Sequence, residues 1–436
     1  MSAGVRPTTT PGLHHRGTSW WNQLWRPFWA LPAALIVASA ALGLTLPYLD
    51  TGDLPYVFSG GADSARTVLS SIIGGMISLT GLVFSITMVV LQQASSQFTP
   101  RILRQFLEAR VVQVTLGVFT GTFVYGLTVL RTVQSANDGN DVTFVPQVSV
   151  TVAMVFVLVS VALFIAFIAY IMRSVQVSQV ITDLTRATRD VVLRFEESAD
   201  APPRTAWSAP GGARADELLN GDRQGYVVAI RADDLARLAA THGVVVELEL
   251  AIGQHVAPGA RLGRVWHLPG DGGGDGADLD GTDLAGLRDA VRLEDDRLLT
   301  NDPMFGLRQL VDIAERALSP GVNDPTTAVQ VVDFAETVLR AAGSLADPAP
   351  VLVDDDGHPR VVYRPWTFER MLALAVDEIS RYGGSSPRVQ RSLHDLLTSI
   401  EPAVRTEHAV LVRRWIRELE AHNAPEDVDE DEDADA

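Results

Sequence analysis

The sequence contains neither cysteine nor lysine, and each absence excludes a group of mechanisms. Without cysteine there is no thiol nucleophile, no disulfide, no iron–sulfur cluster and no thiolate-bound zinc. Without lysine there is no Schiff-base enzyme, no phosphate-loop NTPase of the usual type and no Ser-x-x-Lys acylation site. All 35 basic residues are therefore arginine.

Basic residues are also outnumbered, because the chain has 53 acidic residues and a formal net charge of −18. Much of this charge lies in two segments, the Asp/Gly-rich stretch 271–283 and the tail that begins at residue 423. Both have the composition of solvated, disordered segments, so the net charge mainly describes solubility. We expect no nucleic-acid partner.

Four long apolar runs lie within the first 172 residues, and none of them contains a charged side chain. The runs are 27–49, 67–93, 111–130 and 144–172. A helix of about 20 residues is roughly 30 Å long, which matches the hydrocarbon core of a bilayer. We therefore predict a transmembrane domain of four helices over residues 27–172. A cleaved signal peptide is the alternative for the first run, but three more runs follow it.

Arginine placement predicts the orientation of these helices. The loops and ends on one side carry Arg6, Arg16, Arg26, Arg101, Arg104, Arg110, Arg173, Arg186 and Arg189. The other side has only Arg66 and Arg131. By the positive-inside rule both termini are cytoplasmic, which predicts a multi-pass protein of the bacterial cytoplasmic membrane.

The second run carries a small or polar face. At about 3.6 residues per turn, its members lie within about 80° of one another. They are Ser70, Gly74, Ser78, Gly81, Ser85, Gln92 and Ser96. Two interpretations remain open, namely close packing between helices and a water-lined surface in an oligomeric pore. In the third run, Gly117 and Gly121 form a G-x-x-x-G pattern that is typical of a helix contact.

The remaining chain has the pattern of a cytoplasmic α+β domain that ends in a helical bundle. Its strands are expected at 225–230, 244–250 and 261–267, with a helix at 233–241. The predicted segments are an N-terminal segment 1–26, a lead-out helix 173–197, a linker 198–224, a β-rich subdomain 225–268, an Asp/Gly-rich loop and connector 269–299, a helical subdomain 300–422 and an acidic tail 423–436.

Within the β-rich part, 253–259 is similar to the Gly-x-x-Val-x-x-Gly hairpin of biotinyl and lipoyl barrels. The modified lysine of such carriers is absent, so the hairpin is a structural module or a coincidence.

Two Asn-Asp-Pro triplets, at 301–303 and 323–325, bracket one predicted helix. In each triplet the aspartate is suited to cap the N–H groups of a helix, and the proline is suited to its first position. Ser319-Pro320-Gly321 is expected to end the first helix. These features are explained by structure alone.

A functional interpretation of the same region is a site that binds a ligand or a partner. Its candidate residues are Asp302, Arg308, Asp312, Arg316, Asn323, Asp324 and Thr327. The alternative is a set of capped turns with solvated ion pairs, which contribute little to stability. We predict no catalytic residues, no metal site and no cofactor.

Three segments resemble the bacterial predicted membrane proteins catalogued as domain of unknown function 2254. They are Phe84-Ser-Ile-Thr, Gln92-Gln-Ala-Ser-Ser-Gln-Phe-Thr-Pro-Arg101 and the run from Asp302 to Ala328. The resemblance covers nearly the whole chain apart from its two tails. It supports the topology and implies no activity. It also marks the positions to test, which are Asp302, Phe305, Gly306, Asp312, Ser319, Pro320, Asn323, Asp324 and Pro325.

Three functional hypotheses follow. The first is a homo-oligomeric, channel-like or transport-associated protein with a cytoplasmic regulatory domain. The second is a membrane-anchored sensor or scaffold that binds a small molecule or a protein through the Asn-Asp-Pro region. A membrane enzyme ranks last, because no nucleophile–base pair, metal-ligand spacing or nucleotide loop is present. We therefore expect no enzymatic activity.

Overall fold

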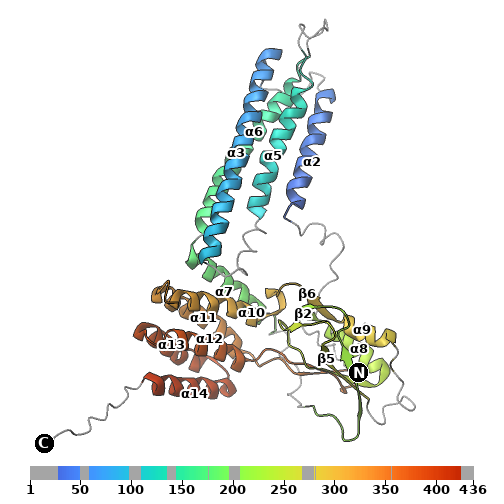
Figure 1. The fold of residues 1–436 in the computed structure, drawn as a ribbon, viewed down its shortest axis with the longest axis vertical. Helices are drawn as coiled ribbons and strands as arrows, with labels where there is room; N and C mark the ends of the chain where they lie inside the picture. The colour runs from blue at the N-terminus through green and yellow to red at the C-terminus, as the bar shows by residue number, and fades with distance from the viewer. Residues whose placement is uncertain are drawn as a thin grey trace, which may run out of the picture. The chain divides into compact units, whose positions relative to one another are not determined.

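The computed structural model describes residues 28–49, 58–97, 110–134, 144–174, 176–195, 207–267, 279, 281–354 and 356–423. These residues form two units, one within Gly17–Gln179 and one within Val180–Ala436. We call them the N-terminal unit and the C-terminal unit. Figure 1 colours the chain from blue at its start to red at its end.

The N-terminal unit consists of long helices. They are α2 (Ala30–Thr45), the short η1 (Leu46–Leu49), α3 (Ala62–Gln97), α5 (Arg110–Leu130) and α6 (Gln147–Ser174). Four of these segments are long and apolar enough to cross a membrane. Each coincides with one of the four predicted runs.

Helix α5 is the most buried of the four candidate spans, with half of its apolar window covered. Its two spaced glycines allow the close approach of α2. A Cβ atom added at Gly117 would lie 2.7 Å from Leu35 Cδ1, and one at Gly121 would lie 2.6 Å from Ser39 Oγ. The G-x-x-x-G pattern is therefore a helix contact, as predicted.

Most of α7 (Val177–Leu193) belongs to the C-terminal unit, which starts at Val180. The predicted lead-out helix 173–197 corresponds to α7, which is a separate helix from α6. One face of α7 is buried, including Ile181, Leu184 and Thr188. A Cβ added at Gly306 would lie 2.0 Å from Thr188 Oγ1, so α7 packs closely on the helix that carries Gly306.

Two sheets follow α7, and the larger has five strands in the order β1-β5-β3-β8-β7. Strand β3 pairs with β8 in parallel, and the other pairs of this sheet are antiparallel. The second sheet has the order β4-β2-β6 and is antiparallel. The strands are β1 (Arg214–Leu219), β2 (Gly225–Ile230), β3 (Val244–Leu248), β4 (His255–Val256), β5 (Arg261–His267), β6 (Val291–Glu294), β7 (Val351–Val353) and β8 (Pro359–Val362).

The predicted strands β2, β3 and β5 are confirmed, as is the helix between the first two, α8 (Ala232–His242). Three segment assignments are corrected. The predicted linker contains β1, the predicted connector contains α9 (Gly281–Asp289) and β6, and the predicted helical subdomain contributes β7 and β8 to the five-stranded sheet. Strands β6, β7 and β8 have three or four residues, too few for a clear alternating pattern, whereas β1 is as long as β2 but carries Ala, Asp and Glu, which are uncommon in strands. Strands β1, β6 and β8 are fixed by partners far away in the sequence.

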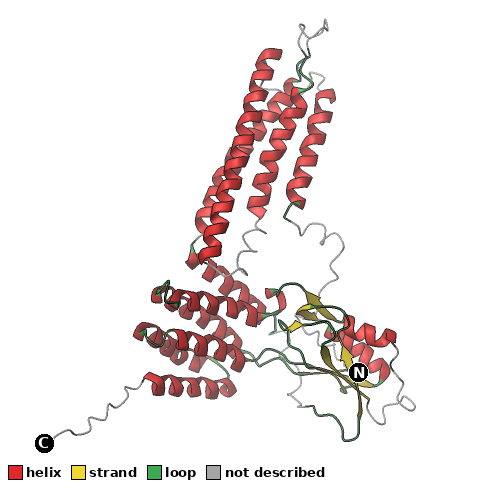
Figure 2. Ribbon diagram, viewed as in Figure 1, coloured by secondary structure: helices red, strands yellow, loops and turns green. Residues whose placement is uncertain are grey.

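The C-terminal helices lie together on one side of this unit, and the strands with α8 and α9 lie on the other (Figures 1 and 2). The helical elements are η4 (Leu299–Asn301), α10 (Pro303–Leu318), α11 (Pro325–Ser344), α12 (Phe368–Tyr382), α13 (Pro387–Ile400), η5 (Glu401–Ala403) and α14 (Thr406–Asn423). The predicted segment 1–26, most of the Asp/Gly-rich loop and nearly all of the acidic tail lie outside the described residues.

Candidate functional site

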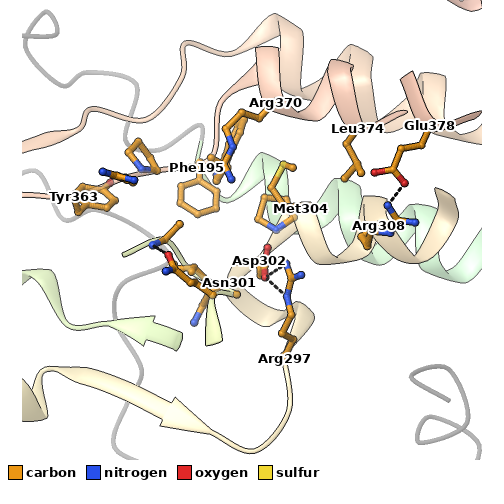
Figure 3. Close-up of a pocket in the computed structure, with 18 residues that line it drawn as sticks. Phe195, Arg297, Asn301, Asp302, Met304, Arg308, Tyr363, Arg370, Leu374 and Glu378 are labelled. Atoms are coloured by element: carbon orange, nitrogen blue, oxygen red, sulfur yellow. Dashed lines mark hydrogen bonds and ion pairs between the residues drawn. The ribbon is translucent and has the colours of Figure 1, made fainter. Parts of the chain in front are cut away.

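A cavity of about 390 Å³ lies in the C-terminal unit where helices and strands meet. Its walls come from the start of α10, one face of α12, the hairpin loop after β3, the segment before α12 and the residue Phe195 after α7 (Figure 3). Two residues of the predicted site, Asp302 and Arg308, contribute to the wall, together with Asn301 of the first triplet. The volume lies within the range of small-molecule sites.

Asp302 is the central polar residue of this wall and is only 3 % exposed. Its Oδ1 accepts the N–H of Phe305 at 3.0 Å, which confirms the predicted cap of α10. Its Oδ2 accepts from Arg297 Nη2 at 2.7 Å and from Nε at 3.1 Å. Burial raises the pKa of Asp302 above its ordinary value, although Arg297 and the capped N–H favour the ionised form.

The 253–259 hairpin now has a structural role. Gly253 has φ +85°, a conformation that glycine adopts without strain. A Cβ at this position would lie 2.3 Å from Asp302 Oδ2 and 2.5 Å from Arg297 Nη2. The hairpin therefore covers the Asp302–Arg297 ion pair, and only glycine leaves room for that pair.

At the other end of the cavity, Arg308 holds three carboxylates. It donates to Asp312 and Glu378 and, at 2.7 Å, to Glu315. The i, i+4 pair with Asp312 is as predicted, but the links to Glu315 and Glu378 were not. Burial and a hydrogen bond with Glu378 raise the pKa of Glu315 to about 7, and the same bond lowers the pKa of Glu378. Glu315 therefore holds a proton more tightly than an ordinary glutamate, and Glu378 holds one less tightly.

An aromatic wall comes from sequence positions far apart. Phe195 follows α7, and its ring meets that of Trp366 edge to face, with centroids 5.5 Å apart. Trp366 is 8 % exposed, and its indole N–H has no hydrogen-bond partner among the described residues. Arg194 donates to the carbonyl of Thr300 at 2.9 Å, which ties the end of α7 to the first Asn-Asp-Pro triplet.

Two further arginines line the cavity, Arg364 and Arg370. Both side chains are exposed, and no described carboxylate lies within ion-pair distance of either. Sequence reasoning missed Arg297, Arg364, Arg370 and the two aromatic residues. The segment Tyr363-Arg-Pro-Trp366 was the available signal for a binding site. It places an arginine between two aromatic residues, beside a proline that disfavours a helix.

The second triplet lies outside this cavity. Asp324 Oδ1 accepts the N–H groups of Thr326 and Thr327 at 3.1 Å, and Oδ2 accepts the Thr327 hydroxyl at 2.6 Å. Asn323 is exposed with φ 47°, as expected of a turn residue. Among the residues that line the cavity, none is Asp312, Arg316, Asn323, Asp324 or Thr327. The structure thus divides the predicted site into a cavity and a capped turn.

The small or polar face of α3 points away from the rest of the N-terminal unit. All its members from Ser70 to Gln92 are exposed, whereas the packed face of α3 carries Ala65, Leu69, Met76 and Val83. A Cβ added at Gly74 or Gly81 would have no neighbour within 4 Å. This face does not pack against the described helices of its own chain.

Carboxylates and a histidine also gather in the turn between β7 and β8. Asp354, Asp356 and His358 bring possible ligand atoms within 4.8 Å of one another. Asp354 already accepts from Arg360 at 2.7 Å and from the N–H groups of Asp356 and His358. This geometry is that of a carboxylate that stabilises its own turn.

Comparison with known proteins agrees with this architecture. The family model described as "Predicted membrane protein (DUF2254)" matches residues 25–399. Uncharacterized proteins of Mycobacterium bovis and Mycobacterium tuberculosis are each 34 % identical over 405 residues, which covers 90 % of this chain and 76 % of each relative. No solved structure matches. The family match extends over both units, and the chain therefore belongs to the DUF2254 family of predicted membrane proteins.

Proposed function

We propose that this protein is a membrane-anchored sensor whose cavity binds a small molecule. The observation that carries the proposal is that the end of α7 forms part of the cavity wall. Phe195 lines the cavity, and the neighbouring Arg194 is tied to Thr300, next to Asn301. A ligand in contact with Phe195 therefore acts directly on the last turn of α7.

Helix α7 is also suited to transmit such a change. Its buried Thr188 lies against Gly306 of α10, whose first turn is capped by Asp302 in the cavity wall. Because Gly306 has no side chain that could adjust its rotamer, a movement of α10 changes the packing of α7 against α10. Only two residues separate the last residue of α6 from the first of α7, so the connection to the fourth apolar helix is short.

In this proposal the four apolar helices anchor the protein in the bacterial cytoplasmic membrane, with both termini in the cytoplasm. The arginine-rich flanks of the apolar runs support that orientation. The C-terminal unit then samples cytoplasmic small molecules. No chemical turnover is required for this role.

Hydrogen–deuterium exchange on the full chain in lipid nanodiscs tests the proposal. The probes are inorganic phosphate, citrate and AMP. We expect at least one probe to slow exchange both at 300–306 and at 188–195, while α14, which contributes no residue to the cavity wall, stays unchanged.

Two matched variants control this experiment. Leu374→Trp adds volume inside the cavity and should abolish the response, whereas Val410→Trp, at a position 59 % exposed on α14, should preserve it. The proposal is wrong if no probe changes exchange in α7, or if Leu374→Trp responds like the unmodified chain.

A second candidate function is an oligomeric conduit, favoured by the exposed face of α3. Small and hydroxyl-bearing side chains that contact no helix of their own chain are suited to a second copy of α3 or to a wet path. Gly81→Leu and Ser85→Leu should lower the oligomer mass in detergent and the ion flux of reconstituted vesicles. Val161→Leu, at an exposed apolar position of α6, is the matched control. Unchanged mass and flux would count against the conduit.

A further inference from the structure

The two ends of the cavity differ in charge, and helix α12 runs from one end to the other. Arg370, Leu374 and Glu378 of α12 are spaced i, i+4 and i+8, so they share one face over two turns, about 12 Å. All three line the cavity. Figure 3 shows Arg370 near Phe195 and Glu378 beside Arg308 at the opposite end. Along α12 the wall therefore changes from cationic through apolar to acidic.

The cationic end has three arginines and one buried carboxylate. Arg297 is paired with Asp302, on which Arg370 also acts electrostatically, and neither Arg364 nor Arg370 forms an ion pair with a described carboxylate. Tyr363 lies at the same end (Figure 3), and burial raises the pKa of its hydroxyl to about 12, so it remains a hydrogen-bond donor at neutral pH. Guanidinium groups in the wall of a cavity suit a phosphate or carboxylate group of a ligand.

The cavity wall also offers surface for a planar ring. Phe195 and Trp366 supply aromatic surfaces, and Met304 and Leu374 supply flexible apolar ones. The buried indole N–H of Trp366 is an unused donor.

The acidic end excludes an anion. Arg308 already donates to Asp312, Glu315 and Glu378, so three carboxylates surround one guanidinium there. An anionic ligand group at this end would be repelled by the excess of negative charge, whereas a ligand N–H group could donate to the carboxylate of Glu378. A ligand with one anionic group would therefore bind in one orientation, with that group at Arg370.

We propose that the cavity binds a nucleoside monophosphate, with the phosphate at Arg364 and Arg370, the base against Phe195 and Trp366, and an amino group of the base toward Glu378. This inference rests on the proposed function and names the ligand class of the same site. The volume of about 390 Å³ is within the range of sites for ligands of this size.

The test is calorimetric titration of the full chain in detergent with AMP, ribose 5-phosphate and adenosine. We expect AMP to bind, and we expect loss of the base or of the phosphate to weaken binding at least about tenfold, as removal of a charge-assisted contact does. Arg364→Gln and Arg370→Gln should each weaken AMP by a similar factor. Arg381→Gln, an exposed arginine of α12 outside the cavity wall, should leave it unchanged.

The outcomes separate this inference from the proposed function. If ribose 5-phosphate binds as tightly as AMP, or if Arg370→Gln binds AMP normally, the assignment of a nucleotide is overturned while a sensor for another anion stands. If AMP binds as expected but exchange in α7 does not change, the nucleotide site stands and the sensor role fails. If none of phosphate, citrate and AMP binds, both fail.

Discussion

The two Asn-Asp-Pro triplets offer a comparison of one capping device in two environments. Asp302 and Asp324 both cap a helix that begins with proline, but Asp302 is 3 % exposed and paired with Arg297, whereas Asp324 lies in an exposed turn. The perturbation is Asp302→Ala compared with Asp324→Ala.

The expected losses differ because of burial. Loss of a cap costs about 1 kcal/mol, and this is the whole effect at Asp324. Asp302→Ala also leaves Arg297 unpaired, and removal of one partner of a buried pair costs about 3–5 kcal/mol. Arg297 is 21 % exposed, so we reduce that contribution to about 2 kcal/mol. The expected losses are about 3 and about 1 kcal/mol, or roughly 6–12 °C and 2–4 °C in Tm.

The pH dependence of the two losses should have opposite signs. Hydrogen bonds from Thr327 lower the pKa of Asp324 below 3.8, so its contribution is present above 3.8 and is lost as the pH falls through the lowered value. Burial raises the pKa of Asp302, so the folded state binds the proton more tightly than the unfolded state. Its contribution is largest below 3.8 and decreases as the pH rises through the raised value.

Thermal unfolding of the full chain in detergent, followed by tryptophan fluorescence between pH 2 and pH 7, measures both effects. The loss from Asp302→Ala should grow as the pH falls from 7 to 3.8, whereas the loss from Asp324→Ala should shrink only below pH 3.8. Asp302→Asn is the matched control, because asparagine retains the cap and removes only the charge. Equal losses at pH 7, or the same pH trend in both variants, would refute the reasoning.

Three further predictions follow from single contacts. Gly306→Val should destabilise the C-terminal unit by about 1–3 kcal/mol through overpacking against Thr188, and Thr188→Ala should partly rescue it; a neutral Gly306→Val would contradict the close contact. Burial opposes the charging of His408, but Asp347 and the Gly343 carbonyl raise its pKa above 6.5. The Tm loss caused by His408→Gln should therefore be present below pH 6.5 and disappear as the pH rises through the raised value. Unfolding scans at pH 6 and pH 9 measure this difference. Glu315→Gln should raise Tm relative to the unmodified chain more at pH 8 than at pH 5, because the pKa of Glu315 near 7 means that its ionised form is disfavoured in the folded state. An equal change in Tm at the two pH values would show that the pKa of Glu315 is not raised.

The sequence alone determined the helices and their ends. Charge-free runs of about 20 residues located the four apolar helices, because their length and composition are local properties. Capping also depends on neighbouring residues only, so Asp302, Asp324 and the Ser319-Pro-Gly stop were predicted correctly. The contact through Gly117 and Gly121 was predicted for the same reason.

Only the tertiary structure decided which of these residues form a site. Strand β1 carries residues that are uncommon in strands, β7 and β8 are short, and β1 and β8 are defined by pairing with the distant strands β5 and β3. Two triplets with identical local chemistry became a buried ion pair and an exposed turn, since burial is a property of the packed chain. The cavity joins Phe195, the first triplet and α12 across more than 180 positions, and no local pattern contains that proximity.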